Sequence, residues 1–194
     1  MEARVYVARG MRMTRSEALA RIEALPEGQN GEFVGGELVV SPRPASPHLH
    51  AATRLGALLM PTLEEGLGGP GGWRFLNEPE LHLGEDILVP DVAAWRTGRM
   101  ERMPVTPAFT LAPDWICEVL SPSTMRFDRA AKMRAYAAAG VQWAWLVDPL
   151  AHTLEIHRRA GDRWLVEDVR AGEADACAAP FDAAPLPLGR LWLT

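Results

Sequence analysis

The sequence predicts a mixed α/β fold, in which a mixed β-sheet carries helices on its faces. Short apolar runs with strand character recur along the chain, two segments repeat apolar residues at helical spacing, and the two kinds of segment alternate. A chain of 194 residues can bury roughly 70% of its unfolded surface in one core. We therefore expect a single domain over residues 1–194, with residues 1–30 as an N-terminal helical appendage.

The first predicted elements are a short helix and a hairpin. Thr14 and Glu17 have the spacing of a capping box, and an apolar stripe follows until Pro26 ends the helix. Two strand-like runs, residues 32–34 and 37–41, flank a glycine pair and predict a β-hairpin.

The middle of the chain predicts a long helix and two strands. After PRPASP, apolar residues recur at helical spacing over residues 48–60. Residues 73–83 and 87–95 have strand character, and the proline-rich segment 96–113 has no period, so we expect a loop that covers a sheet edge.

The remaining elements follow a buried strand over residues 114–121, DWICEVLS, which is apolar on both faces. Ser123 or Thr124 can cap a helix that runs to about Ala139, where Gly140 stops it. After it we expect a buried strand over 141–148, a hairpin of 152–158 with 163–169, and an edge strand over 189–194.

Composition excludes several classes of protein. The net charge of −5 argues against coating nucleic acid through bulk charge, although local contact stays possible. No run is long and apolar enough for a membrane span or a signal peptide, and Cys117 and Cys177 form no metal or disulfide pattern, so we expect a cytoplasmic protein. Six tryptophans exceed the obvious needs of one small core and suggest a homodimer: Trp73, Trp95, Trp143, Trp145, Trp164 and Trp192.

Glu118 is the most informative single residue, because a carboxylate inside WICEVL costs several kcal/mol unless a partner or a metal compensates it. Strand alternation places it on the face of Ile116 and Leu120. Asp91 follows Pro90 at the start of another apolar strand, where a sheet can open. If the two strands are neighbours, the two carboxylates converge, and hard oxygen ligands with open positions suit Mg²⁺ or Mn²⁺.

A cation is expected from the helix that follows. Lys132 is the only lysine among 20 basic residues, and it shares a helix face with Asp128 and Tyr136 at spacings of four. An ammonium turned toward the carboxylates would neutralise charge that develops on a phosphate, or orient an attacking water. The arginines of the same helix either steer a nucleic-acid backbone or form a solvated face.

These segments resemble a known family. PDVAAW, PDWICEVLSPST and DRAAKMRAYAAAGVQWAWLVDP are similar to the signature of the bacterial Uma-two family of endonucleases, which is placed in the PD-(D/E)XK superfamily of restriction-type nucleases. The resemblance runs from GEFVGGELVVSPRPASPHLH to PFDAAPLPLGRLWL. It implies a restriction endonuclease-like core, with a mixed sheet flanked by helices.

The resemblance also assigns roles. Asp91 matches the aspartate and Glu118 the acidic residue of the superfamily site, but Leu120 stands where the lysine is expected. In the resembling family the lysine comes from the following helix, where Lys132 lies. The backbone carbonyl of Val119 is implied as a further metal ligand.

Three more residues are candidates for supporting roles. The resemblance points to His48 and Glu32 as partners of the ligands or as extra ligands, whereas a helix-capping histidine and a solvated glutamate are the alternatives. Asp128 can orient Lys132 from one helical turn away.

The sequence thus predicts a Mg²⁺-dependent endonuclease acting on DNA, and it leaves alternatives open. A nuclease-like fold that binds nucleic acid or a protein partner without cleaving it is the main one. A Cys117 nucleophile with a histidine base, or a zinc hydrolase built on His48 and His50, has weaker support. DNA or RNA preference is not readable. We also expect that removing one of two repelling carboxylates, as in Glu118→Gln, raises thermal stability without metal.

Overall fold

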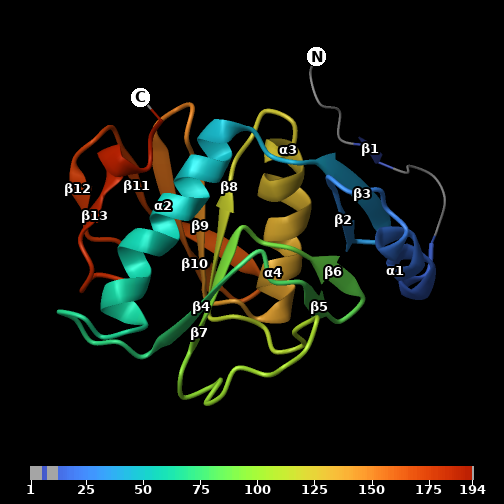
Figure 1. The fold of residues 1–194 in the computed structure, drawn as a ribbon, viewed down its shortest axis with the longest axis horizontal. Helices are drawn as coiled ribbons and strands as arrows, with labels where there is room; N and C mark the ends of the chain where they lie inside the picture. The colour runs from blue at the N-terminus through green and yellow to red at the C-terminus, as the bar shows by residue number, and fades with distance from the viewer. Residues whose placement is uncertain (1–5, 8–12, 194) are drawn as a thin grey trace.

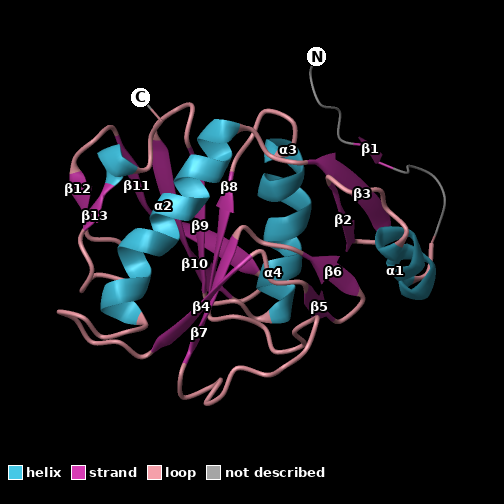
Figure 2. Ribbon diagram, in the orientation of Figure 1, coloured by secondary structure: helices cyan, strands magenta, loops and turns pink. Residues whose placement is uncertain are grey.

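The computed structural model describes residues 6–7 and 13–193, and its centre is a six-stranded mixed sheet in the order β11-β10-β9-β8-β7-β4 (Figure 1). β8 and β9 run parallel, and the other neighbours are antiparallel. A second sheet, in the order β1-β3-β2-β6-β5, lies beside it (Figure 2). The predicted class, a mixed sheet flanked by helices, is confirmed.

The strands and helices have the following bounds: β1 Tyr6–Val7, α1 Arg15–Glu23, β2 Gln29–Val34, β3 Glu37–Pro42, α2 Ser46–Leu63, β4 Trp73–Asn77, β5 Leu81–Leu83, β6 Asp86–Leu88, β7 Val92–Arg96, β8 Trp115–Val119, α3 Met125–Phe127, the π-helix η1 Asp128–Lys132, α4 Met133–Ala139, β9 Trp143–Asp148, β10 Thr153–Ala160, β11 Arg163–Ala171, β12 Asp175–Ala176, β13 Leu186–Pro187 and the 3₁₀ helix η2 Leu188–Arg190. None of the helices in this described part of the chain has the length and apolar character to cross a membrane.

Helices cover both faces of the large sheet, because each sheet face is apolar. Leu55 and Leu59 of α2 pack with Trp115 and Cys117 on one face. Met133 and Tyr136 of the 125–139 helix pack on the other face, in a cluster that also holds Ile116 and Leu120. The predicted split of the β8 side chains between two faces is therefore confirmed.

The N-terminal helix begins as the sequence predicts. Thr14 and Glu17 form the reciprocal capping box, and Ala18 is buried against Phe33 and Leu38 of the β2–β3 hairpin. Of the expected appendage, residues 1–5 and 8–12 lie outside the described residues. The helix that is described packs directly on the second sheet.

Two predicted strands are each broken, and the break forms the site. Residues 73–83 divide into β4 and β5, and residues 87–95 divide into β6 and β7, with the halves in different sheets. Pro79 and Pro90 cannot donate to a ladder, which explains why pairing stops there. Glu78 lies at the first break with a left-handed φ of 48°.

The C-terminal edge strand predicted over residues 189–194 is wrong. The chain instead forms the short pair β12–β13 and the helix η2, and Thr194 lies outside the described residues. Leu191 and Trp192 are buried in the core beside α2, and the Trp192 indole N–H donates to the Gly172 carbonyl at 2.8 Å. Core burial has therefore displaced strand pairing.

The helix after β8 ends as predicted but begins differently. Gly140 adopts a left-handed conformation with φ of 91° and stops the helix. Thr124 precedes the first turn, yet no side-chain cap bond forms at Ser123 or Thr124; the Ser121 hydroxyl instead accepts the Thr124 N–H at 3.3 Å. Residues 128–132 form a π-helical turn that the sequence pattern does not reveal.

The tryptophans belong mainly to the core, which removes the argument for a dimer. Trp73, Trp95, Trp145 and Trp192 are buried, and only Trp143 and Trp164 of the six are partly exposed. A homodimer stays a prediction without that support, and sedimentation velocity would measure it.

Candidate active site

Asp91 lies in the break between β6 and β7, at the edge where β8 ends. Val92 pairs with Cys117, so Asp91 comes beside the last residues of β8. The Val119 N–H donates to Asp91 Oδ2 at 2.6 Å. On the other oxygen, His48 Nε2 of α2 lies 3.1 Å from Asp91 Oδ1. The carboxylate is therefore fixed by one helix and one strand.

Glu118 is buried next to it, and both of its oxygens have partners. Lys132 Nζ lies 2.8 Å from Oε1 and 2.9 Å from Oε2, and the Tyr136 hydroxyl donates to Oε1 at 2.6 Å. Burial raises the pKa of Glu118, and the Lys132 ammonium opposes this effect. A carboxylate in this place needs a nearby cation to remain charged.

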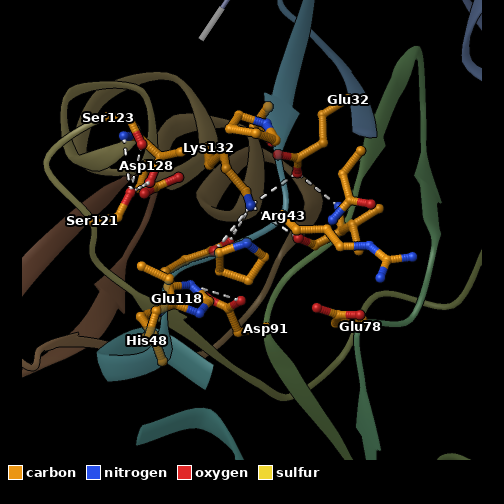
Figure 3. Close-up of a pocket in the computed structure, with 18 of the residues that line it drawn as sticks. Glu32, Arg43, His48, Glu78, Asp91, Glu118, Ser121, Ser123, Asp128 and Lys132 are labelled. Atoms are coloured by element: carbon orange, nitrogen blue, oxygen red, sulfur yellow. Dashed lines mark hydrogen bonds and ion pairs between the residues drawn. The ribbon is translucent and has the colours of Figure 1, made fainter. Parts of the chain in front are cut away.

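Lys132 joins three segments of the chain. Besides Glu118 of β8, its ammonium contacts Glu32 Oε1 of β2 at 2.9 Å and donates to the Val89 carbonyl at 3.0 Å (Figure 3). Burial alone would lower the pKa of Lys132, but the carboxylates of Glu118 and Glu32 raise it well above its ordinary value. Because an ammonium has three donors, this one is fully satisfied and charged.

Asp128 occupies the start of the π-helical turn and is 4% exposed. Burial raises its pKa to about 6, although Lys132 and a side-chain hydrogen bond with Thr124 act in the opposite direction. The same turn places both Asp128 and Lys132 on the buried side of the helix. The predicted shared face is confirmed, while the proposed orienting role of Asp128 is not tested.

The raised pKa of Asp128 predicts how stability depends on pH. The folded state holds the proton that the unfolded chain loses near pH 4, so stability falls as the pH rises from about 4 through the folded pKa of about 6. Asparagine does not titrate. Between pH 4 and pH 7, the free energy of unfolding of Asp128→Asn should therefore rise by about 2 kcal/mol relative to that of the wild type. Urea titrations of both proteins at the two pH values measure this, and a pH-independent difference would contradict it.

Tyr136 is a site residue that sequence analysis did not assign. Its place four residues after Lys132 was visible, but the hydrogen bond to Glu118 depends on how the helix is rotated over β8. Tyr136→Phe leaves one Glu118 oxygen with fewer donors and should lower the free energy of unfolding by about 1–3 kcal/mol. Urea denaturation measures this, and in a Glu118→Gln background the loss should shrink. A loss below about 0.5 kcal/mol in both backgrounds would contradict the role.

The carboxylates of Asp91, Glu118 and Asp128 and the Lys132 ammonium line one pocket of about 600 Å³ (Figure 3). Every predicted site residue reaches it: Glu32, His48, Asp91, Glu118, Val119, Asp128 and Lys132. Residues that sequence analysis did not assign complete the wall, among them Arg43, Glu78, Ser121, Ser123 and Thr124. They come from loops that are far apart in the sequence, and no local pattern marks them.

The donor set fits a hard divalent cation. Asp91 and Glu118 bring carboxylate oxygens to the same pocket, and Mg²⁺ commonly takes one or two carboxylates and completes its shell with water. Within residues 13–193, no three His, Cys, Asp or Glu side chains are grouped as a metal centre, so a cation held by Asp91 and Glu118 would take its remaining ligands from water or substrate. The two histidines of the zinc alternative contact different partners, His48 the Asp91 carboxylate and His50 the Arg190 carbonyl, so that alternative gains no support. Burial raises the pKa of the Cys117 thiol well above its ordinary value, so the cysteine-nucleophile alternative also lacks support.

His48 supports Asp91. Burial lowers the pKa of His48, but the hydrogen bond and charge of Asp91 outweigh this and raise it overall. Its Nδ1 is buried with no hydrogen-bond partner among the described residues. The observed contact therefore fits the expected supporting role better than a helix cap, since α2 has no side-chain cap bond.

The comparisons with known proteins agree with this architecture. Over 93% of its length the chain superposes on 97% of a protein from Anabaena variabilis described as a "putative nuclease belonging to DUF820", with a TM-score of 0.72 and 22% sequence identity. None of the curated proteins searched matches the chain. Residues 16–182 match the model of the Uma2 family, described as "Putative restriction endonuclease". Fold and sequence together identify a nuclease of restriction endonuclease-like type, and the chain belongs to the Uma2 family.

Proposed function

We propose that the chain is a Mg²⁺- or Mn²⁺-dependent endonuclease that hydrolyses phosphodiester bonds of DNA in the pocket around Asp91. The observation that carries the proposal is the meeting of Asp91, Glu118 and Lys132, which come from the break before β7, from β8 and from the helix that follows β8. The family's description supports a nuclease and, through the word restriction, DNA as the substrate.

Asp91, Glu118 and the backbone carbonyl of Val119 would hold the cation. When bound there, such an ion would supply a water of lowered pKa and would polarise the scissile phosphate. His48 keeps Asp91 in place through the 3.1 Å contact. Lys132 holds Glu118 and Glu32 together, and its ammonium balances negative charge that develops at the phosphate.

The test is a cleavage assay on a panel of substrates. Purified protein is incubated with plasmid, linear duplex DNA, single-stranded DNA and RNA, with Mg²⁺, Mn²⁺ or EDTA. We expect cleavage of DNA that needs the cation and is absent in Asp91→Asn. Cleavage that persists in EDTA, or in Asp91→Asn, would overturn the proposed site.

The alternative, a nuclease fold that binds without cleaving, has a separate readout. Titration calorimetry with Mn²⁺ on the wild type and on Asp91→Ala measures the metal site directly. Metal binding that depends on Asp91, with no cleavage of any substrate on the panel, would favour that alternative over the enzyme.

A further inference from the structure

Arg43 is a cation in an acidic pocket. Five carboxylates line the cavity, on Glu32, Glu78, Asp91, Glu118 and Asp128. Arg43 is the arginine and Lys132 the lysine among the residues that line the pocket. Lys132 is 3% exposed and occupied by its three acceptors. Arg43 is exposed, and within residues 13–193 its side chain forms no ion pair and no hydrogen bond.

The segment that carries Arg43 is stiff. Arg43 lies between Pro42 and Pro44, which limit the backbone conformations on both sides. Its N–H donates to the Gly28 carbonyl at 3.1 Å, and a Cβ on Gly28 would lie 3.7 Å from Arg43 Nε. The stem of the side chain therefore lies beside Gly28. This restraint of the backbone lowers the conformational freedom that the segment loses when Arg43 binds a ligand.

Arg43 also lies at a useful place relative to the reactive groups. In Figure 3 its side chain extends along one side of the pocket, the hydroxyl-bearing loop of Ser121 and Ser123 lies on the opposite side, and Asp91 and Glu118 lie between them. A polynucleotide strand with one phosphate at Asp91 and Glu118 therefore continues either toward Arg43 or toward the loop of Ser121 and Ser123. A guanidinium matches the geometry of phosphate oxygens and can donate two hydrogen bonds to them.

We propose that Arg43 binds the phosphate next to the scissile phosphodiester of the substrate strand. The assignment rests on the proposed function. It gives a chain with a net charge of −5 one cation at its acidic pocket that can pair with a phosphate of the substrate. The neighbouring phosphate keeps its charge throughout the reaction, so the contact stabilises the ground state and the transition state equally and affects KM rather than kcat.

The experiment compares Arg43→Ala and Arg43→Lys with Arg54→Ala, a matched control at an exposed arginine of α2 outside the pocket. Steady-state cleavage of a fluorescent DNA oligonucleotide gives KM and kcat. Fluorescence anisotropy with Ca²⁺ in place of Mg²⁺ gives Kd at several salt concentrations. Thermal melts check that each variant is folded.

For Arg43→Ala we expect KM to rise about tenfold with kcat within about twofold of the wild type. The slope of log Kd against log salt concentration should fall by about 0.7–0.9, which corresponds to one lost phosphate contact. Arg43→Lys should restore the slope, because the positive charge returns. It should lower the raised KM only in part, because lysine lacks the planar guanidinium that donates two hydrogen bonds. Arg54→Ala should change neither quantity.

The possible failures are distinguishable. An active enzyme whose KM and salt slope are unchanged in Arg43→Ala overturns the Arg43 assignment and leaves the proposed function standing. A loss of kcat at unchanged KM overturns it as well, because the residue would then act on the chemistry. A wild type that neither cleaves nor binds any nucleic acid on the panel overturns the proposed function and this inference together.

Discussion

Asp91→Asn and Glu118→Gln are each expected to lower the rate of DNA cleavage by about three orders of magnitude, because a metal-polarised site supplies several kcal/mol of transition-state stabilisation. Both substitutions keep the shape of the side chain and remove its charge. In Asp91→Asn the carbonyl oxygen of the introduced amide can still accept the Val119 N–H, which Asp91 now accepts at 2.6 Å, so the fold should persist. Plasmid nicking and thermal melts measure the two effects separately.

Glu65→Gln and Asp162→Asn are the matched controls, since both carboxylates are exposed and neither lines the pocket. They should leave the rate within about twofold. Wild-type rates in either site variant, with the fold intact, would remove that carboxylate from the mechanism.

The sequence-based expectation that Glu118→Gln raises thermal stability does not fit the structure. Glu118 is held by the Lys132 ammonium and the Tyr136 hydroxyl rather than facing only carboxylates. Its removal leaves a buried ammonium with Glu32 as its remaining carboxylate partner. We therefore expect a lower melting temperature for Glu118→Gln.

Lys132→Met has the largest expected effect on stability. The substitution removes the cation shared by Glu118, Glu32 and the Val89 carbonyl, and losing one partner of a buried ion pair costs about 3–5 kcal/mol. For a domain of this size the melting temperature should fall by about 10 °C. Urea denaturation measures the free energy, and Arg163→Met, at a side chain that is 87% exposed, is the control.

A double-mutant cycle separates the ion pair from packing. In a Glu118→Gln background, Lys132→Met should cost less, because one of the unpaired charges is already gone. A loss below about 1 kcal/mol in the single variant would contradict the buried network.

Lys132→Arg tests the role of Lys132 in catalysis. A guanidinium cannot replace a compact ammonium at three tight contacts, and full activity in this variant would exclude Lys132 from the mechanism.

The sequence places the main site residues because two of them are anomalous. Glu118 is a charge inside an apolar strand, and Lys132 is the only lysine of the chain. Asp91 follows from its proline, which breaks the strand. These three features are local, so a single sequence shows them, and the structure brings all three to one pocket.

What the sequence does not predict depends on contacts between distant segments. The Tyr136 hydrogen bond depends on the rotation of the helix over β8, and the place of Arg43 depends on how the β3–α2 loop approaches the ends of the large sheet. The burial of Trp192 displaces an edge strand that its own segment favours. Each requires knowing which elements are neighbours, and local propensity carries no such information.

The π-helical turn Asp128–Lys132 holds one residue more per winding than the α-helical pieces on either side. Successive residues of an α-helix are rotated by about 100° around its axis. In a continuous α-helix, one extra residue would therefore rotate Phe127 and the residues before it by about that angle relative to Lys132. A π-helical turn instead winds the extra residue into nearly one full rotation, so the helical segments on either side stay nearly in phase. The π-helical turn thus absorbs the extra residue locally, and it keeps Asp128 and Lys132 buried on one side of the helix while Ser121 and Thr124 of the preceding loop still reach the pocket.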